Sequence, residues 1–209
     1  MKKLLKLGLV LSCSLLLGAC DGDNEGTKDS STDATETSQV KEEDLLVNHE
    51  KYSKLATNNG AKEAEVVAQK DYPVSWSDNT WSGVTVSIDE VSVLKLDNYE
   101  NFSGKKFPGF IVAHYTINNA ERDLSLFPEL GTIETNTEVK ESGLYEFDHF
   151  ADNLTPGSQV EGYAAYPLTE LDSVKDINQV RIRFSGKYTT EDTSDTNANH
   201  IYDLTLELK

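Results

Sequence analysis

Apolar and polar residues alternate with a period of two through most of the chain after residue 84. Val84 to Val93 is one such run, and Ile111 to Ile117 is another that ends at the turn signal Asn118-Asn119. Because successive side chains of a strand point to opposite faces, these runs predict strands with one buried face. Further strands are predicted at 131–135, 159–166, 179–188 and 200–208, with candidate edge strands at 124–127 and 144–147.

Clusters of Gly, Pro, Asn and Asp separate these runs, and no helical pattern lies between them. Short strands without helical crossovers pair antiparallel and form two packed sheets. We therefore predict an all-β fold, an immunoglobulin-like antiparallel β-sandwich, over residues 74–209. The polar insertion from Thr189 to Asn199 is expected to form a long hairpin loop.

The segment 40–73 has a different period. Leu45, Leu46, Tyr52 and Leu55 recur at helical spacing, and Asn58-Asn59-Gly60 is a helix stop signal. A second helical piece is expected from Ala61 to about Lys70. The sequence thus predicts one or two short helices before the sandwich, and their thin apolar stripes leave both weak packing and partial order open.

The N-terminus combines Lys2, Lys3 and Lys6 with an apolar run from Leu4 to Leu17 that is short for a transmembrane helix. The small residues and the cysteine that follow, Leu17-Gly18-Ala19-Cys20, resemble the lipobox of bacterial lipoproteins. This resemblance implies a signal peptide over 1–19 and a diacylglycerol on the Cys20 thiol. The alternative is an ordinary secretory signal cleaved nearby.

The stretch 20–39 that follows is rich in Ser, Thr, Asp, Glu and Gly and has almost no large apolar side chains. Such a segment cannot bury enough area to offset its ordering entropy, so we expect a disordered tether behind the acylated cysteine. The expected location is the cell membrane, with the protein lipid-anchored and facing the extracytoplasmic side. The membrane lipid is then the first partner, through Cys20.

Charge and cysteine content narrow the classes of partner. The chain has a formal net charge of −17, and removal of the signal peptide makes it more acidic still. Such a surface repels phosphate polymers, so we expect no nucleic-acid partner. The two cysteines are Cys13, inside the signal run, and Cys20, so the mature domain has no disulfide available.

Two stretches of the predicted sandwich resemble a known family. They run from Gly104 to Asn119 and from Leu154 through the Pro156-Gly157 turn to Pro167. They are similar to the immunoglobulin-like domains of uncharacterised function in Gram-positive lipoproteins, a family mislabelled telomeric-repeat-binding-factor-like. The resemblance implies the sandwich over roughly Trp81 to the C-terminus, and it implies no active site.

The sequence contains no Gly-x-Ser-x-Gly elbow, no His-Glu-x-x-His and no glycine-rich phosphate loop. His114, His149 and His200 are far apart, and their spacing supports no zinc or nucleophile site. We therefore expect no catalytic residues, no metal ligands and no cofactor. An enzyme or metal-dependent site at the strand ends remains the alternative, and a cluster of histidine and carboxylates in the structure would favour it.

The loop from Asp97 to Pro108 is the most promising contact surface. It combines Tyr99, Phe102, Lys105 and Lys106 in an otherwise acidic chain, which is a pattern typical of partner-binding loops. The alternative is that Phe102 and Phe107 fill the end of the sandwich. Trp81 is expected in the core, whereas Trp76 and Tyr99 fit either a core or a surface position.

Together these features predict a membrane-anchored extracytoplasmic lipoprotein with a non-catalytic binding domain and a protein partner in the cell envelope. Besides the enzyme alternative, a substrate-capture lipoprotein of a transporter is considered. Such receptors usually need two lobes and a cleft, which this length hardly accommodates.

Overall fold

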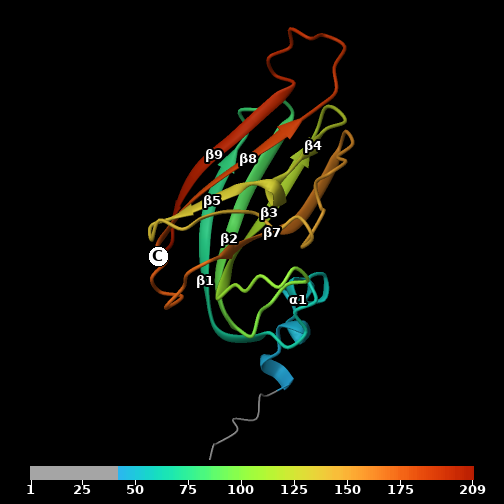
Figure 1. The fold of residues 1–209 in the computed structure, drawn as a ribbon. Helices are drawn as coiled ribbons and strands as arrows, with labels where there is room; N and C mark the ends of the chain where they lie inside the picture. The colour runs from blue at the N-terminus through green and yellow to red at the C-terminus, as the bar shows by residue number, and fades with distance from the viewer. Residues whose placement is uncertain (1–41) are drawn as a thin grey trace, which may run out of the picture. The chain divides into compact units, whose positions relative to one another are not determined.

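The computed structural model describes residues 42–209, so the predicted signal peptide, Cys20 and tether lie outside the described residues. Over this range the chain forms nine strands and four short helical elements (Figure 1). The strands are β1 Glu65–Asp78, β2 Val84–Asp97, β3 Gly109–Asn119, β4 Ser125–Leu126, β5 Thr132–Thr135, β6 Lys140–Ser142, β7 Ser158–Leu168, β8 Gln179–Lys187 and β9 Asn199–Glu207. The helical elements are η1 Glu42–Asp44, η2 Leu46–Asn48, α1 Ser53–Thr57 and η3 Pro128–Leu130. None of these helices is long and apolar enough to cross a membrane.

The strands form two antiparallel sheets. The first has the order β1-β2-β3-β7. In the second, β9 pairs with one edge of β8, β4 and β5 follow one another along the other edge, and β6 extends the sheet beyond β5. This arrangement confirms the predicted all-β sandwich and the predicted hairpin between β8 and β9.

The main core lies between the two sheets. Its members come from alternate positions of the facing strands, which is the outcome that the period-two pattern predicts. Tyr115 of β3 and Phe184 of β8 meet across it, with ring centroids 5.6 Å apart. Trp81 is only 4% exposed, which confirms its place in the core, and Trp76 is partly buried edge-on against Tyr202.

A second core covers the opposite face of the first sheet. Leu94, Phe110 and Val112 point to this side and pack against the segment that contains η2 and α1, where Leu46 and Leu55 are fully buried. The N-terminal segment therefore forms a third layer. Of the two possibilities left open, weak packing and partial order, the structure shows neither at these positions.

Hydrogen bonds fix this layer to the sheet. The Tyr52 hydroxyl donates to Ser92 Oγ at 2.7 Å, and the Ser92 hydroxyl donates to Asp71 Oδ1 at 2.6 Å. Burial raises the pKa of Tyr52 to about 12, so this hydroxyl stays a donor at neutral pH. Lys51 adds an ion pair with Glu90 at 2.7 Å.

The prediction of a helix at 61–70 is wrong, because β1 begins at Glu65. Residues 65–70 pair with β2 from Asp97 to Val93, so the sheet begins inside the segment expected to be helical. Pairing with a long neighbouring strand outweighs the weak local preference for helix. The helix expected from the spacing of Leu45, Leu46, Tyr52 and Leu55 is also shorter than predicted, since Leu45 is extended and bridges to Glu65.

The edge strand predicted at 144–147 is wrong as well. The strand of this region is β6, and Leu144 and Phe147 instead pack into the second core. The Leu144 N–H donates to Ala165 O of β7 at 2.7 Å, and Phe150 lies against Gly162 of the same strand. The segment after β6 therefore covers the edge of the first sheet, which would otherwise be open to pairing with another chain.

If the N-terminal segment is a packed layer, truncation of Leu55 creates a cavity. Leu55→Ala should lower the free energy of unfolding by about 2–5 kcal/mol. Val67→Ala is the matched control, since Val67 on β1 is 52% exposed, and it should change stability by less than about 0.5 kcal/mol. Urea unfolding of the purified protein measures both. Equal, small effects would show that α1 contributes no core.

Candidate functional site

The loop from 98 to 108 presents one of its aromatic residues and buries the others. Phe102 is 81% exposed, whereas Tyr99 is 2% exposed and donates its hydroxyl to Leu55 O at 3.2 Å. Tyr99 is therefore not a contact residue, because α1 and Phe107 enclose it. The alternative in which both Phe102 and Phe107 fill the sandwich end holds for Phe107 alone.

A tight turn holds Phe102 in this exposed position. Asn101 Oδ1 accepts hydrogen bonds from the N–H groups of Ser103 and Lys105, and the Gly104 N–H donates to Asn101 O. The Phe102 ring lies directly over Gly60, where φ is +78° and a Cβ would be 2.4 Å from the ring. An exposed aromatic side chain with a fixed backbone can bind a partner at little entropic cost.

The two lysines of the predicted surface differ in what they contact. Lys105 Nζ lies 4.7 Å from the Phe107 ring centroid, at the side of the loop near Glu141. Lys106 is 80% exposed and 3.5 Å from Glu100. Lys106, Phe102 and the backbone around Gly60 line a surface hollow of about 570 Å³ whose rim also carries Lys62 and Glu63. Of the four candidate residues, Phe102 and Lys106 thus line one hollow.

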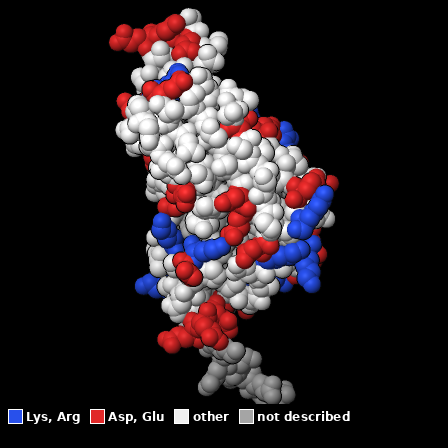
Figure 2. All heavy atoms as spheres, turned by 180° about the vertical axis from the view of Figure 1, so that it is seen from behind, with Lys and Arg blue, Asp and Glu red and all other residues white. Residues whose placement is uncertain are grey.

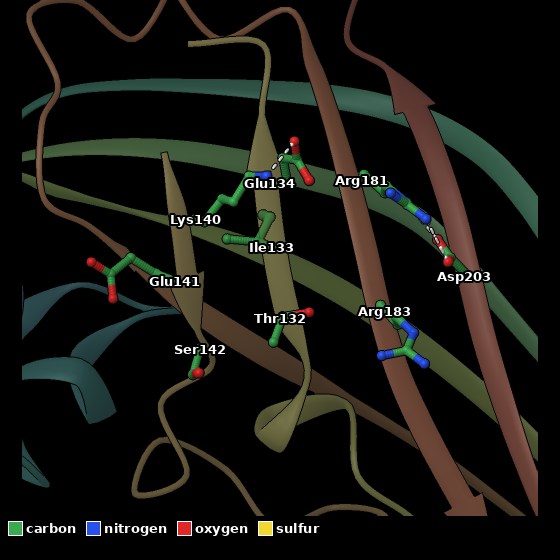
Figure 3. Close-up of a pocket in the computed structure, with 9 residues that line it drawn as sticks. All are labelled: Thr132, Ile133, Glu134, Lys140, Glu141, Ser142, Arg181, Arg183 and Asp203. Atoms are coloured by element: carbon green, nitrogen blue, oxygen red, sulfur yellow. Dashed lines mark hydrogen bonds and ion pairs between the residues drawn. The ribbon is translucent and has the colours of Figure 1, made fainter. Parts of the chain in front are cut away.

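A second hollow, of about 690 Å³, lies on the outer face of the five-stranded sheet (Figure 3). Its side chains form cross-strand ion pairs, Lys140 with Glu134 at 3.0 Å and Arg181 with Asp203 at 2.7 Å. Arg183 lies opposite Thr132, at the next outward position of β8 (Figure 3). Exposed pairs of this kind contribute little to stability, and they leave this face polar and largely neutralised.

The opposite face of the molecule is shown in Figure 2. Its Lys and Arg side chains gather in the lower half of the view, with Asp and Glu side chains among them. The upper tip, formed by the loop between β8 and β9, is acidic. Charges of both signs therefore alternate where the cations concentrate.

The three histidines of interest lie in three different environments. His114 Nδ1 is 2.7 Å from Asp89 Oδ1 on the outside of the first sheet, and His200 stacks on Trp81. His149 differs from the expectation that the histidines lie away from other candidate ligands. Its Nδ1 is 3.8 Å from Asp152 Oδ2, and both residues adjoin the carboxylate of Glu129.

Glu129, His149 and Asp152 form a cluster in which one ligand atom of each lies within 4.8 Å of the others. Glu129 is completely buried, and neither of its carboxylate oxygens accepts a hydrogen bond from another described residue. Asp152 Oδ1 is also buried without a partner. Buried polar atoms are nearly always hydrogen-bonded, so this cluster is the least satisfied polar site in residues 42–209.

The fold brings these residues together from two directions. Glu129 lies in η3, at the point where the chain leaves the edge of β8 between β4 and β5. His149 and Asp152 lie on the segment that covers β7, and Gly143 lets this segment pass η3, since a Cβ there would be 2.4 Å from Glu129 O. The Tyr166 hydroxyl anchors η3 by donating to Pro128 O at 2.9 Å.

The same segment is tied to α1 on its other side. Lys54 pairs with Asp148 at 2.9 Å, and the Asn58 side-chain amide donates to Glu146 O at 2.9 Å. The Lys54 ammonium, which is tied to the segment that carries His149 and Asp152, is thereby engaged by Asp148. Burial raises the pKa of Glu129 to about 7, and the negative charges of Asp152 and Asp148 add to this effect.

The sequence does not predict this cluster, although a grouping of histidine and carboxylates is the feature that favours the metal-dependent alternative. Glu129 is the single acidic residue of an apolar stretch, Leu126-Phe127-Pro128-Glu129-Leu130, and a carboxylate in such a setting is the one signal that points to it. Asp152 and His149 carry no such signal, because their approach to Glu129 depends on the path of the segment after β6.

No protein-family model matches the chain, and no curated protein matches it. The chain is similar in structure to a functionally unknown protein from Listeria monocytogenes, with 11% identity and a TM-score of 0.47 over 75% of this chain and 93% of that one. A candidate lipoprotein from Bacillus subtilis, YcdA, is 13% identical with a TM-score of 0.35 over 63% of this chain and 38% of that one. The secreted protein MPT63 from Mycobacterium tuberculosis is 14% identical with a TM-score of 0.32 over 52% of this chain and 82% of that one. At these identities and TM-scores none of the three assigns a family, a location or a function to this chain.

The raised pKa of Glu129 predicts an unusual dependence of stability on pH. A buried acid of this kind stabilises the fold while it is protonated, so its contribution is complete below pH 4.5 and is lost as the pH rises through about 7. In the presence of EDTA, the wild-type free energy of unfolding should fall by up to about 3 kcal/mol over this window relative to Glu129→Gln.

Urea unfolding at a series of pH values measures this difference. Glu100→Gln, which removes a half-exposed glutamate of the 98–108 loop, is the control and should follow the wild type. Parallel curves for the wild type and Glu129→Gln would contradict the burial of a titrating carboxylate.

Proposed function

We propose that this protein is a membrane-anchored extracytoplasmic lipoprotein whose β-sandwich is a non-catalytic binding domain for a protein of the cell envelope. The anchor is the diacylglycerol on Cys20, and the binding surface is the exposed tip of the 98–108 loop. The single observation that carries the binding role is the 81% exposure of Phe102 on a loop whose backbone is fixed.

The anchoring role rests on the N-terminal sequence. Cationic residues, a short apolar run, small residues and a cysteine follow one another in the order that lipoprotein signal peptides require. A single lipid chain binds a membrane only reversibly, whereas the two chains of a diacylglycerol give stable attachment. The acidic stretch after Cys20 then acts as the linker that spans the distance between the membrane and the folded domain.

The binding role rests on what surrounds Phe102. Aromatic side chains dominate the binding energy of protein interfaces when they enter a pocket on the partner, and cationic neighbours add specificity. Lys62 and Lys106 lie at the rim of the hollow beside Phe102, in a chain of strong negative charge. The partner that fits is a protein surface with an apolar pocket and carboxylates at its edge.

A protein is favoured over a polyanion as the partner. Glu63 and Glu100 line the same hollow as Lys62 and Lys106, so the rim is nearly neutral. A phosphate-rich polymer needs several uncompensated cations in a row. The residues that line the hollow contain no such row, because two lysines are offset by two glutamates.

The anchor predicts a simple labelling result. Because Cys20 supplies the lipid attachment, Cys20→Ala should abolish metabolic labelling with a radioactive fatty acid and release the protein from the membrane fraction. Cys13→Ala, inside the signal run, is the matched control and should be labelled normally. A wild-type protein that takes up no fatty acid would contradict the anchor.

The binding surface predicts a position-specific crosslink. We would replace Phe102 with the photoreactive analogue p-benzoylphenylalanine in intact cells, and Ile201, which is 55% exposed on β9, in a parallel strain. Position 102 should give one adduct of defined mass, and Lys106→Ala should weaken it. Identical adducts at both positions, or none at 102, would place the contact surface elsewhere.

A further inference from the structure

The cluster of Glu129, His149 and Asp152 contains more buried negative charge than the described residues neutralise. Glu129 is 0% exposed, and its two carboxylate oxygens and Asp152 Oδ1 all lack hydrogen-bond partners. Desolvating a carboxylate without a compensating contact is among the most unfavourable events in folding. A proton or a bound cation must therefore neutralise part of this charge in the folded protein.

A shared proton explains only part of this arrangement. One proton between Glu129 and Asp152 would remove one negative charge and join the two carboxyl groups. It would leave unexplained why an imidazole lies at the same place, with Nδ1 3.8 Å from Asp152 Oδ2, too far for a hydrogen bond. A cation that accepts lone pairs from all three side chains accounts for each of them.

Lysine and arginine do not fill this role. Lys54, which is tied to the same segment, forms its ion pair with Asp148. The outer-sheet cations Lys140 and Arg181 are paired with Glu134 and Asp203. Among the described residues, no lysine or arginine forms an ion pair with Glu129 or Asp152, so a compensating cation would be a bound ion.

We propose that Glu129, His149 and Asp152 bind one divalent transition-metal cation of the Zn²⁺ class. One neutral imidazole and two carboxylates form a mixed nitrogen and oxygen donor set, which suits Zn²⁺. Ca²⁺ and Mg²⁺ prefer oxygen ligands alone, so the histidine argues against them. Three protein ligands leave room for water or a partner's side chain at the metal.

The surroundings position the three ligands for this role. The Tyr145 ring packs edge-on against the His149 ring, with centroids 4.1 Å apart, and so limits its rotation. Glu129 is fixed by the anchored η3 turn, and the backbone carbonyl of Asp152 accepts a hydrogen bond from Ser125 Oγ. The ligand atoms already lie within 4.8 Å of one another, and the exposed His149 side chain can close the remaining distance.

We would purify the mature protein without a histidine tag, strip it with EDTA and then remove the EDTA. Zinc binding by this protein tests the proposal. Isothermal titration with Zn²⁺ should give one site per chain, and Zn²⁺ should raise the melting temperature. His149→Gln and Glu129→Gln should each weaken zinc binding at least about tenfold. His114→Gln, which removes a histidine beside a different carboxylate, should leave zinc affinity within about twofold of the wild type.

Folding does not confound this comparison, because His149 is exposed and Glu129→Gln removes a buried charge without changing its shape. X-ray absorption at the zinc edge should show one imidazole nitrogen among oxygen ligands. The proposal is overturned if the wild type takes up no zinc, if zinc binding survives both ligand substitutions, or if Ca²⁺ binds at this site and Zn²⁺ does not.

Discussion

The structure depends on the burial of both faces of the sheet β1-β2-β3-β7. One face packs on the second sheet, and the other is covered by the N-terminal segment with η2 and α1. An antiparallel sheet commonly leaves one face in water, but here Leu94, Phe110 and Val112 make the second face apolar. The segment that covers them is therefore part of the domain, and it determines where the neighbouring loops can go.

Two features of possible function follow from this third layer. Because α1 encloses Tyr99, the base of the 98–108 loop packs into the second core, and its tip with Phe102 is exposed to solvent. On the other side, Lys54 and Asn58 of the same segment hold the stretch that carries His149 and Asp152. One layer thus positions both the exposed aromatic tip and two members of the acidic cluster, although neither feature touches the other.

The sandwich itself could be predicted from the sequence, because alternation such as Val84, Val86 and Ile88 reports directly on a buried face. The local pattern of Glu65 to Lys70 is ambiguous and is compatible with a helix, and the decisive factor is its pairing with the distant β2. The sequence leaves Tyr99 open between a core and a surface position because it lies in a polar loop, and what decides is its contact with Leu55, which is far away in sequence. Glu129, His149 and Asp152 meet only through the path of a loop, and no local pattern encodes that path.

The double burial of the first sheet is the claim on which the rest depends, and native-state hydrogen exchange tests it most directly. Amides bonded within the N-terminal segment, Leu46 to Ala64 O at 2.8 Å and Ala61 to Ala56 O at 3.0 Å, can be compared with amides at the centre of β3. If the segment is an integral layer, these amides should exchange only by global unfolding, with the same free energy of opening as β3. Fast exchange at Leu46 and Ala61 while β3 stays protected would show that the segment opens on its own, and would contradict the account.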